Sequence, residues 1–217
     1  MKTVSQEDNF YFLFFALLAL FFGSAVMQQF YPQGQKTVIG LIILTLFVSI
    51  LGVHRKRAIY RSFYGVLLTV AGISYGLSLL ETFDLTIVTL LTLLFVICIH
   101  IFSALKQVFL TSVISTNNII GSICVYLLMG LAWSFIYLTI LELFPNAFVG
   151  VEQQAWLTNF FHMLYFSFIT LTTVGYGDVS PAIPLAKFFV FMQSIIGSFY
   201  VAILVASLVS AKLSQSN

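Results

Sequence analysis

The residues with the clearest chemical potential are seven consecutive positions, Thr172–Asp178, which read TTVGYGD. They follow an apolar and aromatic stretch, Trp156–Leu171, and precede another long apolar stretch. Glycine adopts backbone angles that other residues avoid, so Gly175 and Gly177 allow successive carbonyl groups to point to one side of the chain. A row of carbonyl oxygens of this kind can replace the hydration shell of an ion. The motif therefore predicts a backbone site for dehydrated cations.

The composition of the chain places this motif in a lipid bilayer. Of the 217 residues, 60% are hydrophobic and 7% are charged, whereas soluble domains have about 25% charged residues. A soluble enzyme, a nucleic-acid-binding protein and a disordered chain are thereby excluded. The net charge of +2 indicates no electrostatic partner. At membrane depth, extended backbone is tolerated only where it is buried in protein or lines a water-filled path.

Six stretches are long and apolar enough to cross the bilayer or nearly so, since a spanning helix needs about 20 such residues. They are Phe10–Met27, Thr37–Val53, Ala58–Leu80, Asp84–Leu105, Ile119–Phe144 and Leu185–Ala211. Trp156–Leu171 is too short to cross together with the TTVGYGD run, which predicts a re-entrant half-helix. A cleaved signal peptide is the alternative for the first stretch, although its leading residues are net acidic and five spans follow. The sequence predicts an all-α membrane protein with six transmembrane helices.

Lysine and arginine residues predict the orientation of these spans, because cytoplasmic loops carry an excess of basic residues. With both termini inside, only Lys36 and Lys187 lie outside, and the remaining basic residues are cytoplasmic: Lys2, Arg55, Lys56, Arg57, Arg61, Lys106 and Lys212. The cluster of Arg55, Lys56, Arg57 and Arg61 could also contact anionic lipid headgroups. We expect a multi-pass protein of the plasma membrane with both termini cytoplasmic.

Residues Ile119–Leu213 resemble the pore domain of the tetrameric potassium channels. All seven residues of TTVGYGD agree with the filter of that family, and the motif lies in the expected place between two spans. The resemblance implies an outer helix, a pore helix at 156–171, a filter at 172–178 and an inner helix at 185–211, with four chains around one pore. It assigns Thr173, Val174, Gly175 and Tyr176 to the coordination of potassium ions, and it implies no cofactor beyond these ions.

The resemblance also assigns supporting roles. Tyr165 and Phe166 occupy the places of an aromatic pair that braces the filter. Some channels carry a glutamate that pairs with the filter aspartate where this chain has Ile169, so Asp178 needs another partner, and the Tyr165 hydroxyl could supply it. Gly197 falls where the family has a gating hinge, and close helix packing through a small residue is the alternative.

Residues 1–105 are predicted to form a four-helix transmembrane domain in the place of a voltage sensor. A cytoplasmic interfacial linker, 106–118, would join them to the pore domain at 119–217. A voltage sensor needs arginine at every third position of its fourth span, but Asp84–Leu105 contains no arginine or lysine. Moving one charge through 100 mV contributes about 2.3 kcal/mol, and steep gating uses three or four such charges per subunit. We therefore expect weak or absent voltage gating.

Several polar residues carry weaker expectations. His100 is expected to be a buried, hydrogen-bonded histidine, and His162 is a candidate for sensitivity to external pH. Asn117 and Asn118 suit a cap at the start of the fifth span. The two cysteines, Cys98 and Cys124, predict small buried side chains and neither a disulfide nor a metal site.

The function predicted from the sequence is passive, potassium-selective conduction, which is not an enzymatic activity. A non-selective cation channel is one alternative, but its filter would lack a carbonyl site, and TTVGYGD is complete. A membrane transporter is another, but inverted repeats would show two broken helices, and the sequence indicates one re-entrant segment. An embedded enzyme would need clustered His, Glu, Asp or Cys residues, which these spans lack.

Overall fold

The computed structural model describes residues 10–31, 38–45, 65–66, 69–73, 76, 85–109 and 116–215. The long helices of this part are α1 (Phe10–Phe30), α4 (Thr86–Phe109), α5 (Thr116–Leu143), α6 (Trp156–Leu171) and α7 (Pro184–Gln215). Two short strands, β1 (Phe148–Val149) and β2 (Ser180–Pro181), pair antiparallel. The all-α class is confirmed, and the small β1–β2 ribbon is an addition that the sequence did not predict.

Among the described residues, four helices are long and apolar enough to cross a membrane, namely α1, α4, α5 and α7. The 16 residues of α6 extend about 24 Å, which falls short of a hydrocarbon core of about 30 Å. α6 covers the same residues as the half-helix predicted from the sequence. The second and third predicted spans, Thr37–Val53 and Ala58–Leu80, lie mostly outside the described residues. Their described parts, 38–45, 65–66, 69–73 and 76, are helical.

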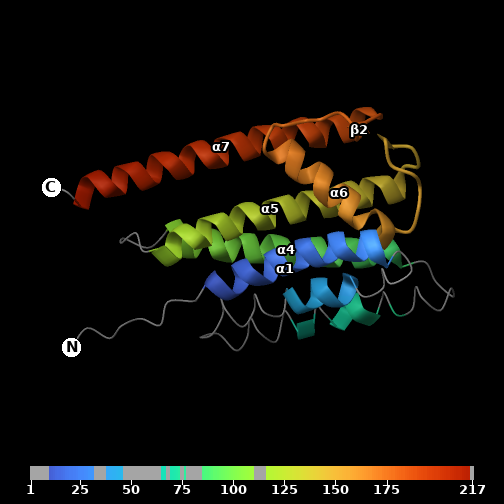
Figure 1. The fold of residues 1–217 in the computed structure, drawn as a ribbon, viewed down its shortest axis with the longest axis horizontal. Helices are drawn as coiled ribbons and strands as arrows, with labels where there is room; N and C mark the ends of the chain where they lie inside the picture. Colours follow the sequence, from blue (N-terminus) through green and yellow to red (C-terminus); the bar gives the residue numbers. More distant parts are fainter. Residues whose placement is uncertain are drawn as a thin grey trace.

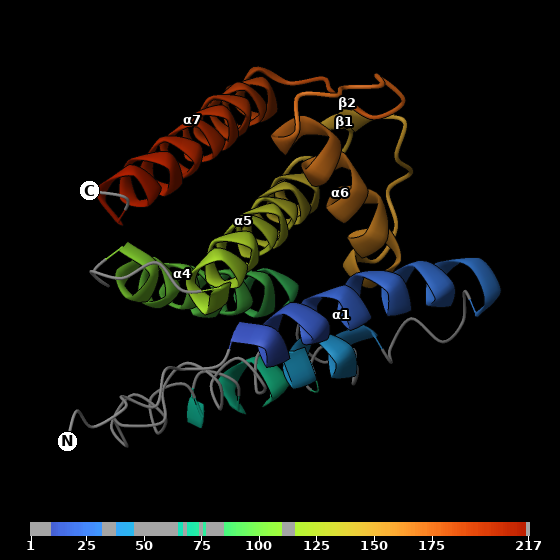
Figure 2. The same cartoon turned by 60° about the vertical axis from the view of Figure 1, so that its left-hand side comes forward.

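α5 is the central helix of the described packing, because it contacts α1, α4, α6 and α7. In Figure 1 and Figure 2, α1 and α4 lie on one side of α5, whereas α6 and α7 lie on the other. α1 begins and α7 ends at the same end of the molecule, and the loop that leads from α6 to α7 lies at the opposite end (Figure 1). α6 therefore lies between the central helix and the last one, near the end that carries the connecting loops.

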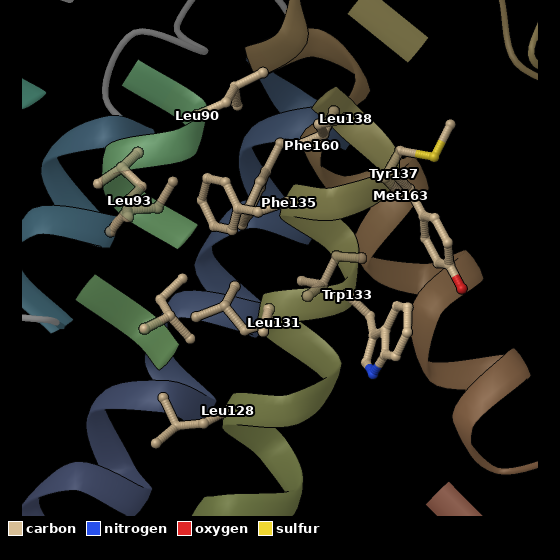
Figure 3. Packing of buried hydrophobic residues seen from close by; sticks show 14 of the residues in the cluster. Leu90, Leu93, Leu128, Leu131, Trp133, Phe135, Tyr137, Leu138, Phe160 and Met163 are labelled. Carbon is tan, nitrogen blue, oxygen red and sulfur yellow. The ribbon is translucent and has the colours of Figure 1, made fainter. Parts of the chain in front are cut away.

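The side chains of α5 fill the space on both of its sides. Leu128, Leu131 and Phe135 are buried and point toward α1 and α4, as Figure 3 shows. Trp133 and Tyr137 leave the helix on the opposite side. Residues spaced by three or four positions share one face of a helix, so these two sets form two separate apolar faces. Such a helix is buried by neighbours on both sides, as expected for the core of a membrane protein.

The connection between α4 and α5 is shorter than the predicted linker 106–118. α4 continues to Phe109 and α5 begins at Thr116, so only residues 110–115, which lie outside the described residues, separate the two helices. Lys106 belongs to the last turn of α4, where its Nζ lies 4.4 Å from the centre of the Phe102 ring. Residues 106–109 of the predicted linker thus belong to α4, and residues 116–118 belong to α5.

The predicted caps of the fifth span were wrong. α5 begins at Thr116, so Asn117 and Asn118 lie inside the helix. The side-chain oxygen of Asn117 accepts a hydrogen bond of 3.1 Å from the N–H group of Phe10, the first residue of α1. Asn117 thus satisfies a donor at the start of α1, because the first turns of α1 and α5 lie side by side.

Candidate functional site

The TTVGYGD segment folds back over the C-terminal end of α6. The N–H groups of Val174 and Gly175 both donate hydrogen bonds to the carbonyl oxygen of Ile169, at 2.8 and 3.1 Å. The N–H groups of Thr172 and Thr173 bond carbonyl oxygens in the last turn of the helix. These bonds satisfy carbonyl groups that a helix end otherwise leaves without partners. They also turn the first N–H groups of the segment toward α6.

Every second residue of the segment has a positive φ angle. The values are 60° for Thr173, 55° for Gly175 and 81° for Gly177. This region of backbone angles is routine for glycine and uncommon for threonine, which makes Thr173 a strained position. Within the described part of the chain, no donor bonds the carbonyl oxygens of residues 173–176. The backbone therefore directs its N–H groups to the helix and leaves a row of carbonyl oxygens available to a cation.

The segment is exposed in the single chain, although α6 beside it is mostly buried. Val174 is 52% exposed and Tyr176 is 72% exposed. α7 is also mostly exposed over positions 184–207, where its buried residues share one face of the helix: Ala186, Gln193 and Gly197. Apolar surface of this extent marks a region that other molecules cover.

Tyr165 of α6 is linked directly to the end of the segment. Its hydroxyl group interacts with the carboxylate of Asp178. This hydrogen-bonding interaction is the largest of the effects that raise the pKa of Tyr165 above its ordinary value of 10.0, and desolvation and the negative charge of Asp178 act in the same direction. Tyr165 therefore interacts with the residue that follows the last glycine, and its role as a support of the filter stays a prediction.

Phe166 lies on the other side of α6 in a cluster of three aromatic rings. Its ring centre is 5.1 Å from that of Tyr137 in α5 and 5.6 Å from that of Phe148 in β1. Tyr137 and Phe148 are themselves 5.5 Å apart in an edge-on arrangement. Aromatic rings at such distances and tilts attract one another beyond the burial of their surface. The cluster fixes α6 against the C-terminal half of α5.

The loop after α5 holds the loop after the TTVGYGD segment, a contact that sequence reasoning missed. Phe148 lies opposite Pro181 in the β1–β2 ribbon, and the N–H group of Ala182 donates to the carbonyl oxygen of Ala147 at 2.8 Å. Gly150 adopts a φ of +88°, and a Cβ atom there would overlap the carbonyl oxygen of Asp178. Strands of two residues leave no periodic pattern in a sequence, so only the structure reveals this brace.

Gly197 packs against the last residue of α6 without any break in α7, which runs as one helix through this position. The carbonyl oxygen that it approaches, on Leu171, also accepts a 3.2 Å hydrogen bond from the hydroxyl group of Tyr126 in α5. This direct contact with Leu171 supports close helix packing, which is the alternative predicted for Gly197. The gating hinge stays a prediction.

The remaining candidates lie away from the TTVGYGD segment. His162 is exposed, and its Nε2 lies 3.4 Å from Nε2 of Gln28 at the end of α1, whereas His100 is buried in α4. Cys124 is buried as predicted, but Cys98 is exposed on α4, and both are free thiols. The basic cluster at residues 55–61 lies outside the described residues. Among the described residues, no three His, Cys, Asp or Glu side chains come together to hold a metal ion.

Comparisons with known proteins assign the same region. Residues 122–212, which begin within α5 and end in the last turn of α7, match a family model described as an ion channel. The chain is also similar to two pore potassium channel c of Oryza sativa subsp. japonica, with 49% identity over 47 residues, which are 22% of this chain and 10% of that protein. The match thus spans about a tenth of the length of this curated relative.

Residues 122–212 are therefore similar to an ion-channel domain, and they include most of α5 and of α7, two of the helices in the described chain that are long and apolar enough to cross a membrane. The family model covers the part of the sequence that resembles the potassium-channel pore domain, and both similarities agree with that resemblance.

Proposed function

We propose that four copies of this chain surround one axis and form a potassium-selective pore in the plasma membrane. The ions would be held by the carbonyl oxygens of Thr173, Val174, Gly175 and Tyr176, with the Thr173 hydroxyl group at the innermost site. The alternation of positive φ angles at Thr173, Gly175 and Gly177 carries this proposal. It supplies a row of oxygens, and the N–H groups of Thr173, Val174 and Gly175 in the same row are already bonded to α6.

The need for several chains follows from the coordination of the ion. One chain supplies one row of oxygens, whereas a dehydrated potassium ion needs oxygens on all sides. The exposure of Val174, Tyr176 and most of α7 supports the proposal, because neighbouring copies would cover these surfaces. Four identical rows around an axis are the arrangement by which such filters replace a hydration shell.

Electrostatics would favour a cation along this axis without any charged side chain inside the bilayer. The C-terminal end of a helix carries roughly half a negative charge, and α6 ends immediately before the segment. Four such ends would stabilise a cation beneath the filter. Four copies of Asp178 at the outer end would raise the local concentration of cations.

The whole chain would form six spans with both termini in the cytoplasm. The common location of the start of α1 and the end of α7 supports two termini on the same side of the membrane (Figure 1). The first four spans would brace the pore without sensing voltage, since α4 has a single basic residue, Lys106, in its last turn. Arg55, Lys56, Arg57 and Arg61 would contact anionic lipid headgroups on the cytoplasmic side.

Purified protein in potassium-loaded vesicles tests conduction. We expect rapid potassium efflux once a counter-ion path is supplied, and no efflux from Gly175→Ala, because alanine is strained at the φ of +55° that residue 175 adopts. Gly40→Ala is the matched control, since a Cβ atom at position 40 meets nothing within 4 Å. Equal efflux from the wild type and Gly175→Ala would contradict conduction through this segment. Substrate uptake without unitary current steps would instead identify a transporter.

A further inference from the structure

A set of buried hydrogen bonds joins the three helices around the filter. Nε2 of Gln193 in α7 donates to the carbonyl oxygen of Ser167 at 3.0 Å and to its Oγ at 2.8 Å. The Tyr137 hydroxyl group of α5 donates to Oε1 of the same glutamine. The Ser167 Oγ donates in turn to the carbonyl oxygen of Gly130 at 2.7 Å. Tyr137, Ser167 and Gln193 all have an exposure of 0%.

Gln193 is the centre of this set because its amide group uses both of its ends. The nitrogen bonds α6 and the oxygen bonds α5, so one side chain of α7 connects to both neighbours. Figure 3 shows the Tyr137 ring leaving α5 on the side opposite to Phe135. An amide buried among apolar helices is retained only where it is fully hydrogen-bonded, since an unpartnered polar group in such surroundings is strongly unfavourable.

The hydrogen bonds lie close to the anchor of the filter. Ser167 precedes Ile169 by two residues, and the carbonyl oxygen of Ile169 accepts the N–H groups of Val174 and Gly175. The same face of α7 continues along α6, because Gly197 packs against Leu171. A shift of α6 against α7 would therefore move the Ile169 carbonyl group and the two filter residues bonded to it.

We propose that Gln193 is a positioning residue that sets the ion selectivity of the filter. It fixes the rotation and depth of α6 between α5 and α7, and thereby the spacing of the carbonyl oxygens at Val174 and Gly175. This inference rests on the proposed function, because it concerns the selectivity of the same pore. The sequence contained one signal for it, a single amide residue in the middle of an otherwise apolar span, FFVFMQSIIG.

Bi-ionic reversal potentials test this role, with potassium on one side of a planar bilayer and sodium on the other. The reversal potential does not depend on how many channels fold, so a variant that only lowers the yield of tetramer leaves it unchanged. We expect Gln193→Leu to lower the permeability ratio of potassium over sodium at least tenfold, which shifts the reversal potential by about 59 mV toward zero. Ser198→Ala is the control, because the Ser198 Oγ bonds only the carbonyl oxygen of Ser194 in its own helix.

A double variant separates positioning from general damage. Gln193→Leu leaves the Tyr137 hydroxyl group without its acceptor, and the double variant Tyr137→Phe/Gln193→Leu removes that hydroxyl group as well. We therefore expect the double variant to be no less selective than Gln193→Leu alone. If Gln193→Leu forms no tetramer, Ser167→Ala takes its place and should shift the potential in the same direction. A selective wild type with unchanged selectivity in these variants would overturn the role of Gln193 alone. A wild type that passes sodium and potassium equally would overturn the proposed function together with it.

Discussion

The carbonyl oxygen of Leu171, at the end of α6, lies directly against Gly197 of α7. A Cβ atom at position 197 would stand 2.7 Å from this oxygen and 2.7 Å from Cδ1 of the same leucine. Backbone oxygen cannot move aside as a flexible side chain can. Position 197 therefore accepts only glycine while α6 and α7 keep their present distance.

Replacement of Gly197 by alanine separates close packing from a flexible hinge. Alanine is favoured over glycine in a helix by roughly 1 kcal/mol, so Gly197→Ala should raise the stability of the protein if position 197 is a hinge without packing contacts. Overpacking costs about 1–3 kcal/mol, so the contact with Leu171 should make Gly197→Ala less stable than the wild type. Thermal unfolding of the detergent-solubilised protein measures the difference. Gly40→Ala is the control, and an unfolding temperature for Gly197→Ala at or above that of Gly40→Ala would contradict the packing account.

The hydrogen bond between Tyr165 and Asp178 predicts a kinetic effect. Tyr165→Phe removes the donor and keeps the ring, so the outer end of the filter should lose a tether while its carbonyl oxygens stay in place. We expect faster decay of current during sustained conduction, with little change in the size of unitary currents. Patch recordings of Tyr165→Phe beside Tyr31→Phe, an exposed tyrosine after α1, provide the comparison. Identical decay in the two variants and the wild type would show that the bond does not stabilise the filter.

The pH dependence of this tether follows from the direction of the pKa shift. The bond requires the protonated hydroxyl group, and it raises the pKa of Tyr165 above 10.0. Its contribution is therefore fully present below the ordinary tyrosine pKa and is lost as the pH rises through the elevated value. We expect the difference in current decay between the wild type and Tyr165→Phe to persist at an external pH of 10. Its disappearance between pH 8 and 9 would argue against a tyrosine donor.

Voltage should have little effect on opening. α4 runs from Thr86 to Phe109 with one basic residue, Lys106, in its last turn over the ring of Phe102. A charge at the end of a helix crosses little of the membrane field, whereas steep gating needs three or four charges per subunit. Open probability measured between strongly negative and strongly positive potentials should give a gating charge below about one per subunit. A larger value would require a sensor elsewhere in the chain.

The sequence predicted the long apolar helices well because hydrophobic length alone specifies them. The helix predicted at Trp156–Leu171 has the observed bounds, and α1, α4, α5 and α7 differ from their predicted ranges by a few residues. An interaction between Tyr165 and Asp178 was also predicted, because this chain has Ile169 where some channels have a glutamate that pairs with the filter aspartate. These features depend on local pattern or on a short distance along the chain.

Contacts between segments that are distant along the chain could not be predicted from the sequence. Asn117 stands next to the start of α5 in sequence, and only the approach of α1 makes it a partner of Phe10. The bonds of Gln193 to Ser167 and Tyr137 cross 26 and 56 residues, and the β1–β2 ribbon has too few residues for a periodic signal. Such contacts are set by tertiary packing, which no single-helix pattern records.

The reversal potential of the wild-type protein under a potassium gradient tests the central claim most directly. With a tenfold gradient of potassium across a planar bilayer, and sodium replacing it to keep the ionic strength equal, a potassium-selective filter should hold zero current near about 59 mV, with the sign set by the potassium gradient. A reversal potential at zero would show that sodium and potassium pass equally, and it would contradict a selective filter at Thr172–Asp178.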